Sequence, residues 1–420
     1  MNLFKLSWKY LTFRPLSTGL NVFLLALGLA IITVLLLIQD QLEKKMTQDA
    51  AGIDLVVGAK GSPLQLILAG VYHIDFPTGN IPMDEAQKLS RNRLVKNSIP
   101  MALGDNHQGF RIVGTNHDYP ALYQAKLQSG VLWVKPFEVV LGAEVAEKSN
   151  YKVGDEFIGS HGISVGSHEH DANNFKVVGV LERKGNVLDR LILTSVESIW
   201  YTHDEGATMT PDSTTNHVAH QEVAFSDSVA TKGFPITTES RELTTVLIQY
   251  RNPMAAIQLP RLINSGTSMQ AASPSFEMSR LFELLGVGIT LLKGLAVVII
   301  GISGLGIFIA LYNSLKERKY DLAILRVLGA SRRQLLLLIF LEGIMLTFLG
   351  AILGILLGHT FLAVIISQNE QGVVGTLQPW IFLQQELWIV VYALVVGVLA
   401  SIIPALAAYQ TSIAKQLTKV

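Results

Sequence analysis

The sequence contains no cysteine, which excludes disulfide bonds, thiolate metal ligands and cysteine nucleophiles. Charged residues make up only 16% of the 420 residues, and 33 basic residues balance 33 acidic ones. A bulk nucleic-acid partner is therefore not indicated. The phosphate-binding pattern G-x-x-x-x-G-K-[ST] is absent, and no Ser-His-Asp or paired-carboxylate arrangement can be placed by spacing. We therefore expect no enzyme in this chain, and any ATP with its Mg²⁺ must be bound by a partner.

Long apolar runs are abundant, because half of the residues are hydrophobic. Four runs are long enough to cross a bilayer, and they cover residues 20–38, 284–315, 335–366 and 387–406. Residues 1–19 begin with MNLFKLSWKYLTFR, in which Phe4, Trp8 and Leu11 share one helical side. This pattern predicts an interfacial helix on the cytoplasmic leaflet. The first run lacks a small-residue cleavage site after it, so we expect an uncleaved anchor.

Basic residues mark the side on which each connection lies. They gather in the amino-terminal segment and in residues 316–334, whereas the loop at 367–386 has neither lysine nor arginine. Lysine and arginine in short loops stay on the cytoplasmic side of a membrane. The pattern predicts that both termini, including the tail at 407–420, are cytoplasmic and that residues 39–283 lie outside.

Residues 39–283 hold no further membrane-length run. Short β-branched segments bounded by glycine, proline, asparagine and aspartate predict strands in IDLVVGAKG, FRIVGTN, FEVVLGAEV, FKVVGVLER, RLILTS and TTVLIQYR. Helical patterns cover Met83 to Leu94 and Met254 to Asn264, and both ends of the segment read as stalks that continue the spans. The sequence thus predicts an α-helical membrane protein with four transmembrane helices plus a large α+β extracytoplasmic domain.

The segment at 316–334, KERKYDLAILRVLGASRRQ, predicts a short helix between two spans. Leu322, Leu325 and Leu328 fall along one side, and Gly329 is a helix stop. Ser331 and Gln334 form the S-x-x-Q pattern of a capping box for the next helix. We interpret the segment as a docking helix for a cytoplasmic partner, with Arg326 orienting the contact. A positively charged topogenic loop is the alternative.

Two features stand out inside the third span. Gly350, Gly354 and Gly358 recur every four residues and place a smooth stripe along a helix, which favours a helix-packing seam over a substrate path. Glu342 is a carboxylate at a depth where it needs a partner or a proton. We expect a structural or coupling contact between Glu342 and basic residues near the turn, rather than a proton relay.

Histidines and carboxylates gather in one stretch of the predicted extracytoplasmic domain. His161, His168, His170 and Asp171 lie within eleven residues, and imidazole and carboxylate groups together suit Zn²⁺. A second group contains His203, His217 and His220. The spacing is irregular, so a solvated polar loop is the alternative reading.

Several stretches carry a resemblance to a known family, above all ERKYDLAILRVLGASRRQLLLLIFLEG across the basic turn. LVVGAKGSPLQLIL, LGAEVAEKSNYKVGDEF, FKVVGVL and the closing PALAAYQTSIAKQL add to it. The chain resembles ABC transporter permeases of the MacB/FtsX/LolC-E type, also called type VII. The resemblance implies a bacterial inner-membrane protein with a periplasmic domain, a cytoplasmic ABC ATPase docked on the turn helix, and a second permease copy as homodimer or heterodimer. The chain departs from MacB itself because it has no fused ATPase domain.

The resemblance leaves the function of the periplasmic domain open. The leading hypothesis is a permease that moves this domain with the ATP cycle to transport or extrude a substrate, with membrane lipid around it and a periplasmic binding protein as a candidate partner. The histidine-rich insertion is similar to that of permeases from zinc-responsive systems. An FtsX-like regulator that transports nothing and an anchored metal sensor are the alternatives, although a sensor needs no ATPase-docking helix.

The histidine-rich stretch yields a direct prediction for the purified protein. We expect Zn²⁺ to bind through His168, His170 and Asp171, with His161 as a fourth ligand. Isothermal titration should show stoichiometric binding that weakens below about pH 6.5, because the ligands must be neutral imidazoles. Binding that survives His168→Ala plus His170→Ala would move the site to the second histidine group. No binding at micromolar zinc would show that these residues are solvated loop residues.

Overall fold

The computed structural model describes residues 3–13, 15–161, 169–204, 229–237, 240–368 and 374–410, and within these ranges it leaves out the side chains of 160–161, 169–173 and 203–204. The chain divides into two compact units. One, here called the helical unit, comprises Met1–Glu43 and Glu283–Val420, and the other, the sheet unit, comprises Lys44–Phe282. The sheet unit corresponds to the segment predicted at 39–283.

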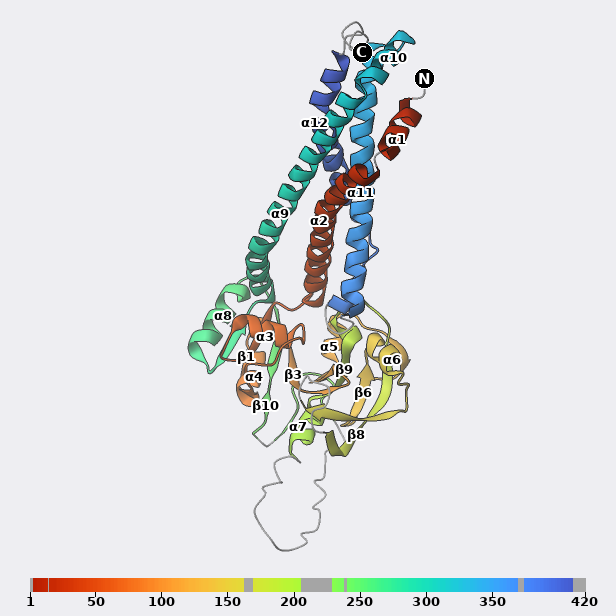
Figure 1. The fold of residues 1–420 in the computed structure, drawn as a ribbon. Coiled ribbons are helices and arrows are strands. Elements are labelled where there is room, and N and C mark those ends of the chain that lie inside the picture. Colours follow the sequence, from red (N-terminus) through yellow and green to blue (C-terminus); the bar gives the residue numbers. More distant parts are fainter. Residues whose placement is uncertain are drawn as a thin grey trace, which may run out of the picture. The chain divides into compact units, whose positions relative to one another are not determined.

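The helical unit contains four helices that are long and apolar enough to cross a membrane, as far as the described residues show. They are α2 (Pro15–Asp49), α9 (Pro274–Glu317), α11 (Arg332–Gln368) and α12 (Glu386–Tyr409), and the four predicted spans lie within them. Three short elements accompany them: α1 (Leu3–Phe13), α10 (Lys319–Val327) and a 3₁₀ turn at Val374–Thr376. Figure 1 shows α1 and α10 at the same end of this unit, as the predicted topology requires.

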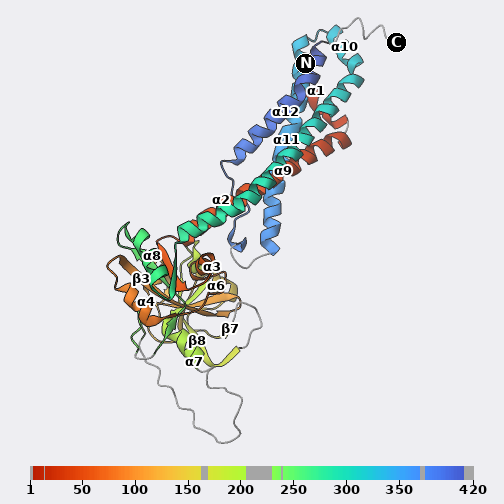
Figure 2. The same cartoon turned by 90° about the vertical axis from the view of Figure 1, so that its left-hand side faces the viewer.

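Helix α11 is the centre of the helical unit. Its apolar residues share one core with residues of α2, α9 and α12, among them Leu29, Ile300, Leu346 and Ala393. Helices α11 and α12 run side by side in Figure 2 and approach closely where Gly343 and Gly397 leave room for each other's backbone. Helix α1 packs on α11 at the opposite end from the 3₁₀ turn, where the Ser7 hydroxyl donates to the Leu338 carbonyl over 3.3 Å.

The sheet unit combines twelve strands with six α-helices and one 3₁₀ helix within the described residues, besides the end of α2 and the start of α9. Its strands are β1 (Leu55–Ala59), β2 (Ile81–Pro82), β3 (Val95–His107), β4 (Phe110–Thr115), β5 (Leu127–Gly130), β6 (Glu138–Leu141), β7 (Glu156–His161), β8 (Glu169–Leu181), β9 (Leu191–Ser195), β10 (Glu242–Leu243), β11 (Thr245–Tyr250) and β12 (Met269–Ala272). Its helices are α3 (Pro63–Gly70), α4 (Met83–Ser90), α5 (Asp118–Leu122), α6 (Ala143–Ser149), η1 (Val187–Arg190), α7 (Val196–Asp204), α8 (Ala255–Gly266) and the start of α9.

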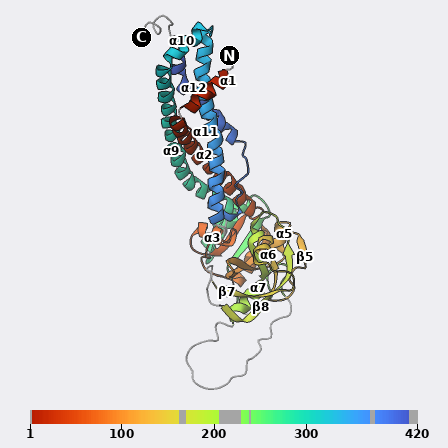
Figure 3. The ribbon, with the colours of Figure 1, turned by 45° about the vertical axis from the view of Figure 1, so that its right-hand side comes forward.

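The main sheet follows the order β12-β1-β11-β3-β4-β9-β6-β8-β5, and β7 pairs with both β3 and β8. The strands β3, β4, β9, β6, β8 and β7 therefore pair in a closed ring. The long strand β3 joins this ring to β12, β1 and β11, which form a second part of the sheet. Figure 1 shows the two parts, with α3, α4 and α8 beside the second part and α5 and α6 beside the ring; Figure 3 shows α6 and β5 from another side.

The two helices that enter and leave the sheet unit connect to neighbouring strands. Strand β1 begins six residues after the end of α2, and β12 ends two residues before the start of α9. These two strands pair antiparallel, with Val57 opposite Ala271. A displacement of either helix therefore acts on the same edge of the main sheet.

Each of the six strand segments expected from the sequence contains a strand, and both expected helices form as α4 and α8. The longest missed element is β3, which carries Pro100 in its interior. Proline cannot donate to a strand ladder and usually indicates a break. Here Pro100 stands opposite Val246 of β11, and its carbonyl accepts a hydrogen bond from the Thr115 hydroxyl over 3.0 Å. Because β3 contains polar residues and a proline, the sequence did not predict this strand, although it joins both parts of the sheet.

Gly142 provides a test of the packing in the ring. A Cβ on Gly142 would overlap the backbone of Leu188 and Asp189. We expect Gly142→Ala to destabilise the sheet unit by roughly 1–3 kcal/mol, because backbone atoms cannot move aside as a side chain can. Thermal unfolding followed by circular dichroism measures the change. Gly266→Ala is the matched control, since nothing lies within 4 Å of that position; equal melting of both variants would contradict the packing.

Candidate functional site

Helix α10 forms a short, capped element between α9 and α11. It ends where Gly329 adopts a φ of +99°, a conformation that residues with a side chain rarely take. The Ala330 amide donates back to the Leu325 carbonyl over 2.9 Å. The predicted capping box also forms: the Ser331 amide donates to the Gln334 side chain over 2.7 Å, and the Gln334 amide donates to the Ser331 hydroxyl over 3.3 Å. The turn is thus a fixed helix–stop–helix unit.

The two faces of α10 differ in what they contact. Leu322 and Ala323 are buried in a small core with residues of α1, α9, α11 and α12, including Leu315, Leu335 and Ala408. The opposite face presents apolar side chains that remain exposed among the described residues, namely Tyr320, Ile324, Val327 and Leu328. Leu328 alone is 77% exposed. We call these four residues the outer face of α10.

The sequence-predicted coupling residues do not all lie on the outer face. Leu328 does, whereas Leu322 points into the core of the helical unit and Leu325 is half-buried against the same core. Arg326 is also half-buried. Tyr320, Ile324 and Val327 were missed, although their spacing of four and three residues is itself a helical stripe. The stripe at 322, 325 and 328 was more visible because all three residues are leucine.

Arg318 at the start of α10 holds the turn to the rest of the helical unit. Its guanidinium lies 3.1 Å from the Glu342 carboxylate on α11, and Glu342 is 1% exposed. The ring of Tyr10 on α1 stacks over the same guanidinium at 4.0 Å. Burial raises the pKa of Tyr10, so the phenol stays neutral beside the pair. One arginine thus joins α1, α10 and α11.

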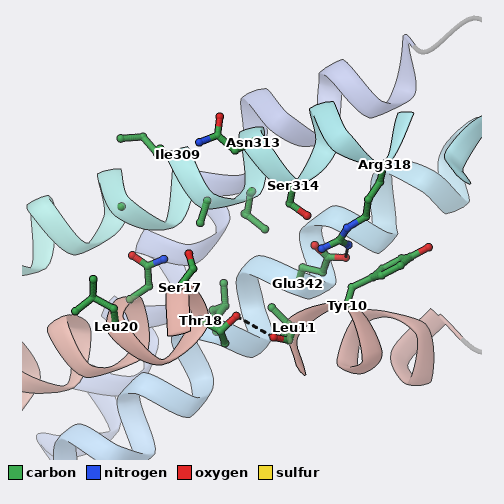
Figure 4. Close-up of a pocket in the computed structure, with 15 residues that line it drawn as sticks. Tyr10, Leu11, Ser17, Thr18, Leu20, Ile309, Asn313, Ser314, Arg318 and Glu342 are labelled. Carbon is green, nitrogen blue, oxygen red and sulfur yellow. Dashed lines mark hydrogen bonds and ion pairs between the residues drawn. The ribbon is translucent and has the colours of Figure 1, made fainter. Parts of the chain in front are cut away.

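A pocket of about 220 Å³ lies next to this ion pair, between the start of α2 and the end of α9. Figure 4 shows Arg318, Glu342 and Tyr10 at one end of it, with Ser17 and Leu20 of α2 facing Ile309 and Asn313 of α9. Its lining mixes hydroxyl and amide groups with aliphatic side chains. The pocket leaves space beside the pair at the same end of the unit as α10.

The three glycines of α11 face helix α2. A Cβ on Gly350 would meet Leu25, one on Gly354 would meet Leu29 and the Ala26 carbonyl, and one on Gly358 would meet Thr33. The stripe therefore lies against a neighbouring helix of the same chain. Because glycine has no side chain to interlock, the contact between α2 and α11 is smooth along its length.

The predicted zinc ligands cannot be compared with the structure. His168 lies outside the described residues, as do His217 and His220, and the side chains of His161, His170, Asp171 and His203 are not described. Among the described residues, no three histidine or acidic side chains lie close enough together to hold a metal ion. Zinc binding by the histidine-rich stretch stays a prediction.

A charged cluster fastens the last turns of α2 within the sheet unit. Asp49, which is 1% exposed, lies 3.3 Å from the Arg190 guanidinium and 3.7 Å from the Lys45 ammonium. Tyr72 and Tyr123 donate their hydroxyl groups to the carbonyls of Met46 and Asp49, so the helix end is held from two further sides.

A buried histidine next to this cluster stays uncharged. Burial, together with the nearby Arg111 and Arg190, lowers the pKa of His73 well below its usual value. His73 then shares a neutral hydrogen bond of 3.1 Å with the Tyr119 hydroxyl. The ion-pair contacts of the cluster are therefore those of Asp49 with Arg190 and Lys45. Sequence reasoning missed this cluster, because its members are separated by up to 145 positions from Lys45 to Arg190.

The buried pair of Arg318 and Glu342 predicts a coupled loss of stability. Removing one partner of a buried ion pair costs roughly 3–5 kcal/mol, because the other charge stays buried without compensation. We expect Glu342→Ala and Arg318→Ala each to lower the melting temperature of the detergent-purified protein, and the double variant to lose less than the sum. Strictly additive losses in this cycle would mean that the two groups do not stabilise each other.

Comparison with known proteins matches both units. The model of the MacB-like periplasmic core domain matches residues 18–242, which is more than half of the chain, and the model of the FtsX-like permease C-terminal domain matches residues 293–413. An uncharacterized ABC transporter permease of Methanocaldococcus jannaschii is 27% identical over 123 residues. That match covers 29% of this chain and 31% of the relative, so the chain spans about a third of the relative's length.

Two solved structures resemble the chain at low similarity. The periplasmic region of MacB from Actinobacillus actinomycetemcomitans is 12% identical with a TM-score of 0.34, and the match covers 56% of this chain and 97% of that region. The extracellular domain of the noncanonic ABC-type transporter YknZ from Gram-positive bacteria is 13% identical with a TM-score of 0.29, covering 53% and 99%. Both family models match the chain, which has four membrane-length helices and a large extracytoplasmic domain. The chain therefore belongs to the ABC transporter permeases of the MacB/FtsX type.

Proposed function

We propose that this permease couples ATP hydrolysis by a separate cytoplasmic ATPase to movement of its extracytoplasmic domain. The observation that carries the proposal is the outer face of α10. In the part of the chain that the structure describes, Tyr320, Ile324, Val327 and Leu328 form an exposed apolar surface on a helix whose other face is firmly packed. Basic residues surround it, as expected at the cytoplasmic side of a membrane. ATP and Mg²⁺ bind to the partner, and this chain supplies the surface on which the partner acts.

The contacts around α10 would transmit a displacement of this helix to its neighbours. Only Arg318 separates the end of α9 from the start of α10, and Arg318 is the residue that pairs with Glu342. A displacement of α10 therefore moves the end of α9 and pulls on α11 at the same time. Helix α9 continues without interruption to Pro274, two residues after β12. Movement driven by the ATPase would therefore reach the sheet through a continuous helix and not through a flexible linker.

Helix α2 provides the second connection. Its end is held in the sheet unit by Asp49, Arg190, Lys45 and two tyrosines, so that the helix and the sheet move together there. The smooth contact with the glycines of α11 lets α2 slide along its neighbour at low cost. We infer that the same seam serves both packing and sliding.

A second permease copy fits against α9. Much of this helix is exposed, and no described residue lies within 4 Å of the Cβ positions of Gly286, Gly294 and Gly301. Glycine in a helix costs roughly 0.5–1 kcal/mol relative to alanine. Close approach of another helix at these positions offsets that cost, which supports a homodimer or a heterodimer with a related permease.

The moved domain either transports a substrate across the envelope or regulates a periplasmic partner. We favour transport or extrusion, and keep an FtsX-like regulator and a zinc-linked permease as alternatives. Recovery of a periplasmic hydrolase with the purified protein would favour the regulator. Recovery of a histidine-rich binding protein would favour the zinc-linked permease.

The outer face of α10 is tested by introducing charge where an apolar contact is expected. Burying a leucine or isoleucine at an interface contributes roughly 1.5–3 kcal/mol, so Ile324→Asp plus Leu328→Asp should abolish recovery of the ATPase. The measurement is affinity purification of the tagged permease from its own membranes, followed by ATPase activity in the eluate.

Asp321→Ala is the matched control, because Asp321 is exposed on the same helix but lies outside the apolar face. It should leave recovery of the ATPase unchanged. The double variant must also keep the melting temperature of the parent protein, since both substituted residues are exposed. Full ATPase recovery with the double variant would show that α10 is only a topogenic loop element.

A further inference from the structure

A buried imidazole–carboxylate pair lies at the opposite end of α11 from α10. His359 of α11 is 0% exposed and Glu386, the first residue of α12, is 4% exposed. The His359 Nε2 atom lies 3.1 Å from Glu386 Oε2, and the His359 Nδ1 atom lies 2.5 Å from the carbonyl oxygen of Pro379. The other Glu386 oxygen accepts the Leu383 amide over 3.0 Å. No role described above uses this pair.

The protons of this arrangement can be counted. A carbonyl oxygen only accepts hydrogen bonds, so the contact with Pro379 requires a hydrogen on Nδ1. In neutral histidine the Nε2 atom then carries a lone pair, and an ionised Glu386 also offers only lone pairs. Two acceptors at 3.1 Å do not form a hydrogen bond. One further proton must lie between Nε2 and Oε2, either on the imidazole or on the carboxyl group.

We propose that His359 and Glu386 form a buried proton-binding site at the extracytoplasmic end of the membrane helices. With its proton the pair has no net charge, which suits a site shielded from water. Among the described residues, Glu386 is the titratable group that contacts His359. Helix α2 presents Ala30 and Thr33 beside the adjacent Gly358, and the connection to α12 presents Pro379, Trp380 and Phe382.

The bound proton fixes the connection between the 3₁₀ turn and α12. Trp380 stacks on the His359 ring with 5.9 Å between centroids and an interplanar angle of 7°, and Phe382 lies 4.7 Å from it. Gln378 exchanges two hydrogen bonds with Gln41 of α2, over 3.0 and 2.7 Å. The protonated pair therefore holds a segment that links α11 and α12 to α2.

The direction of the pH dependence follows from the proton count. In the closed form, the protonated pair holds the connection between the 3₁₀ turn and α12 in place; in the released form, this connection has moved away and both side chains are exposed to water. The closed form holds one proton that the released form gives up above about pH 6.5, where an exposed histidine is neutral. Raising the pH beyond this value must therefore favour release, and lowering it must favour the closed segment. Below about pH 6.5 both forms are protonated, and the equilibrium loses its pH dependence.

Leu377→Cys supplies a reporter, since the chain has no other thiol and Leu377 is 8% exposed. The rate of labelling by a membrane-impermeant maleimide on the full-length protein measures release of the segment. Glu386→Gln is the decisive second change, because its amide donates to Nε2 and its oxygen still accepts from Leu383. It satisfies every contact without the additional proton between the two side chains.

The labelling rate of the protein with Glu386 is divided by the rate of the Glu386→Gln variant at the same pH. This ratio cancels the effect of pH on the reactivity of the thiol itself. We expect this ratio to rise between about pH 6.5 and about pH 8.5, by up to about tenfold per unit, because release frees one proton. His359→Gln should label fast at every pH. A ratio that stays constant with pH, or slow labelling of His359→Gln, would overturn the proposal.

Two further controls separate a general effect from this site. Glu283→Gln changes an exposed carboxylate of α9 and should leave the ratio unaltered; an equal effect there would count against the pair. Where Leu377→Cys destabilises the protein, the emission of Trp380, taken as the difference from Trp380→Phe, replaces labelling. That emission must change with pH when Glu386 is present and stay flat with Glu386→Gln.

Discussion

The need to satisfy every polar group inside a membrane shapes helix α11. This helix carries one buried carboxylate, Glu342, towards α10 and one buried imidazole, His359, towards the extracytoplasmic side. Each is paired with one group from a neighbouring element, Arg318 in the first case and Glu386 in the second. An unpaired charge at either position would be costly in hydrocarbon. The two pairs therefore fix the ends of α11 against its neighbours.

Between these two pairs α11 is smooth. Gly350, Gly354 and Gly358 face α2 and offer no side chains that would interlock with it. A helix fixed at both ends and smooth between them keeps its place while a neighbour shifts along it. The charged cluster at Asp49 fastens that neighbour to the sheet unit instead. The chain thus separates contacts that are held by charges from a contact that is smooth, as the proposed transmission of movement requires.

The sequence predicted much of this arrangement where the evidence is local. Apolar runs predicted the four spans, and the Ser331–Gln334 pattern predicted a cap that forms as expected. Glu342 was expected to contact a basic residue near the turn, and Arg318 fills that position. The exposed face of α10 was harder to predict, because an amphipathic helix with two apolar stripes does not reveal which stripe its own chain covers.

Contacts between distant residues could not be read from the sequence. Arg190 and Asp49 are 141 positions apart, and a lone arginine in RLILTS has no local sign of a partner. His359 and Glu386 belong to different helices, and their pairing depends on how the connection between the helices returns. The proline of β3 led to the opposite error. Proline usually indicates a break in a strand, but β3 forms because it pairs with a strand on each side. In each case the tertiary fold supplies the missing partner.

The choice of cation distinguishes the two ends of α11. Arginine keeps its charge at every pH that a protein experiences, so the Arg318 guanidinium of the cytoplasmic pair does not respond to acidity. Histidine is the side chain that most readily changes its charge near neutral pH, which suits the proton-binding pair proposed at the extracytoplasmic end. In the proposed coupling, the partner ATPase engages α10, next to the arginine. An arginine next to α10 and a histidine at the far end would therefore place the proposed response to acidity beside α2, away from α10.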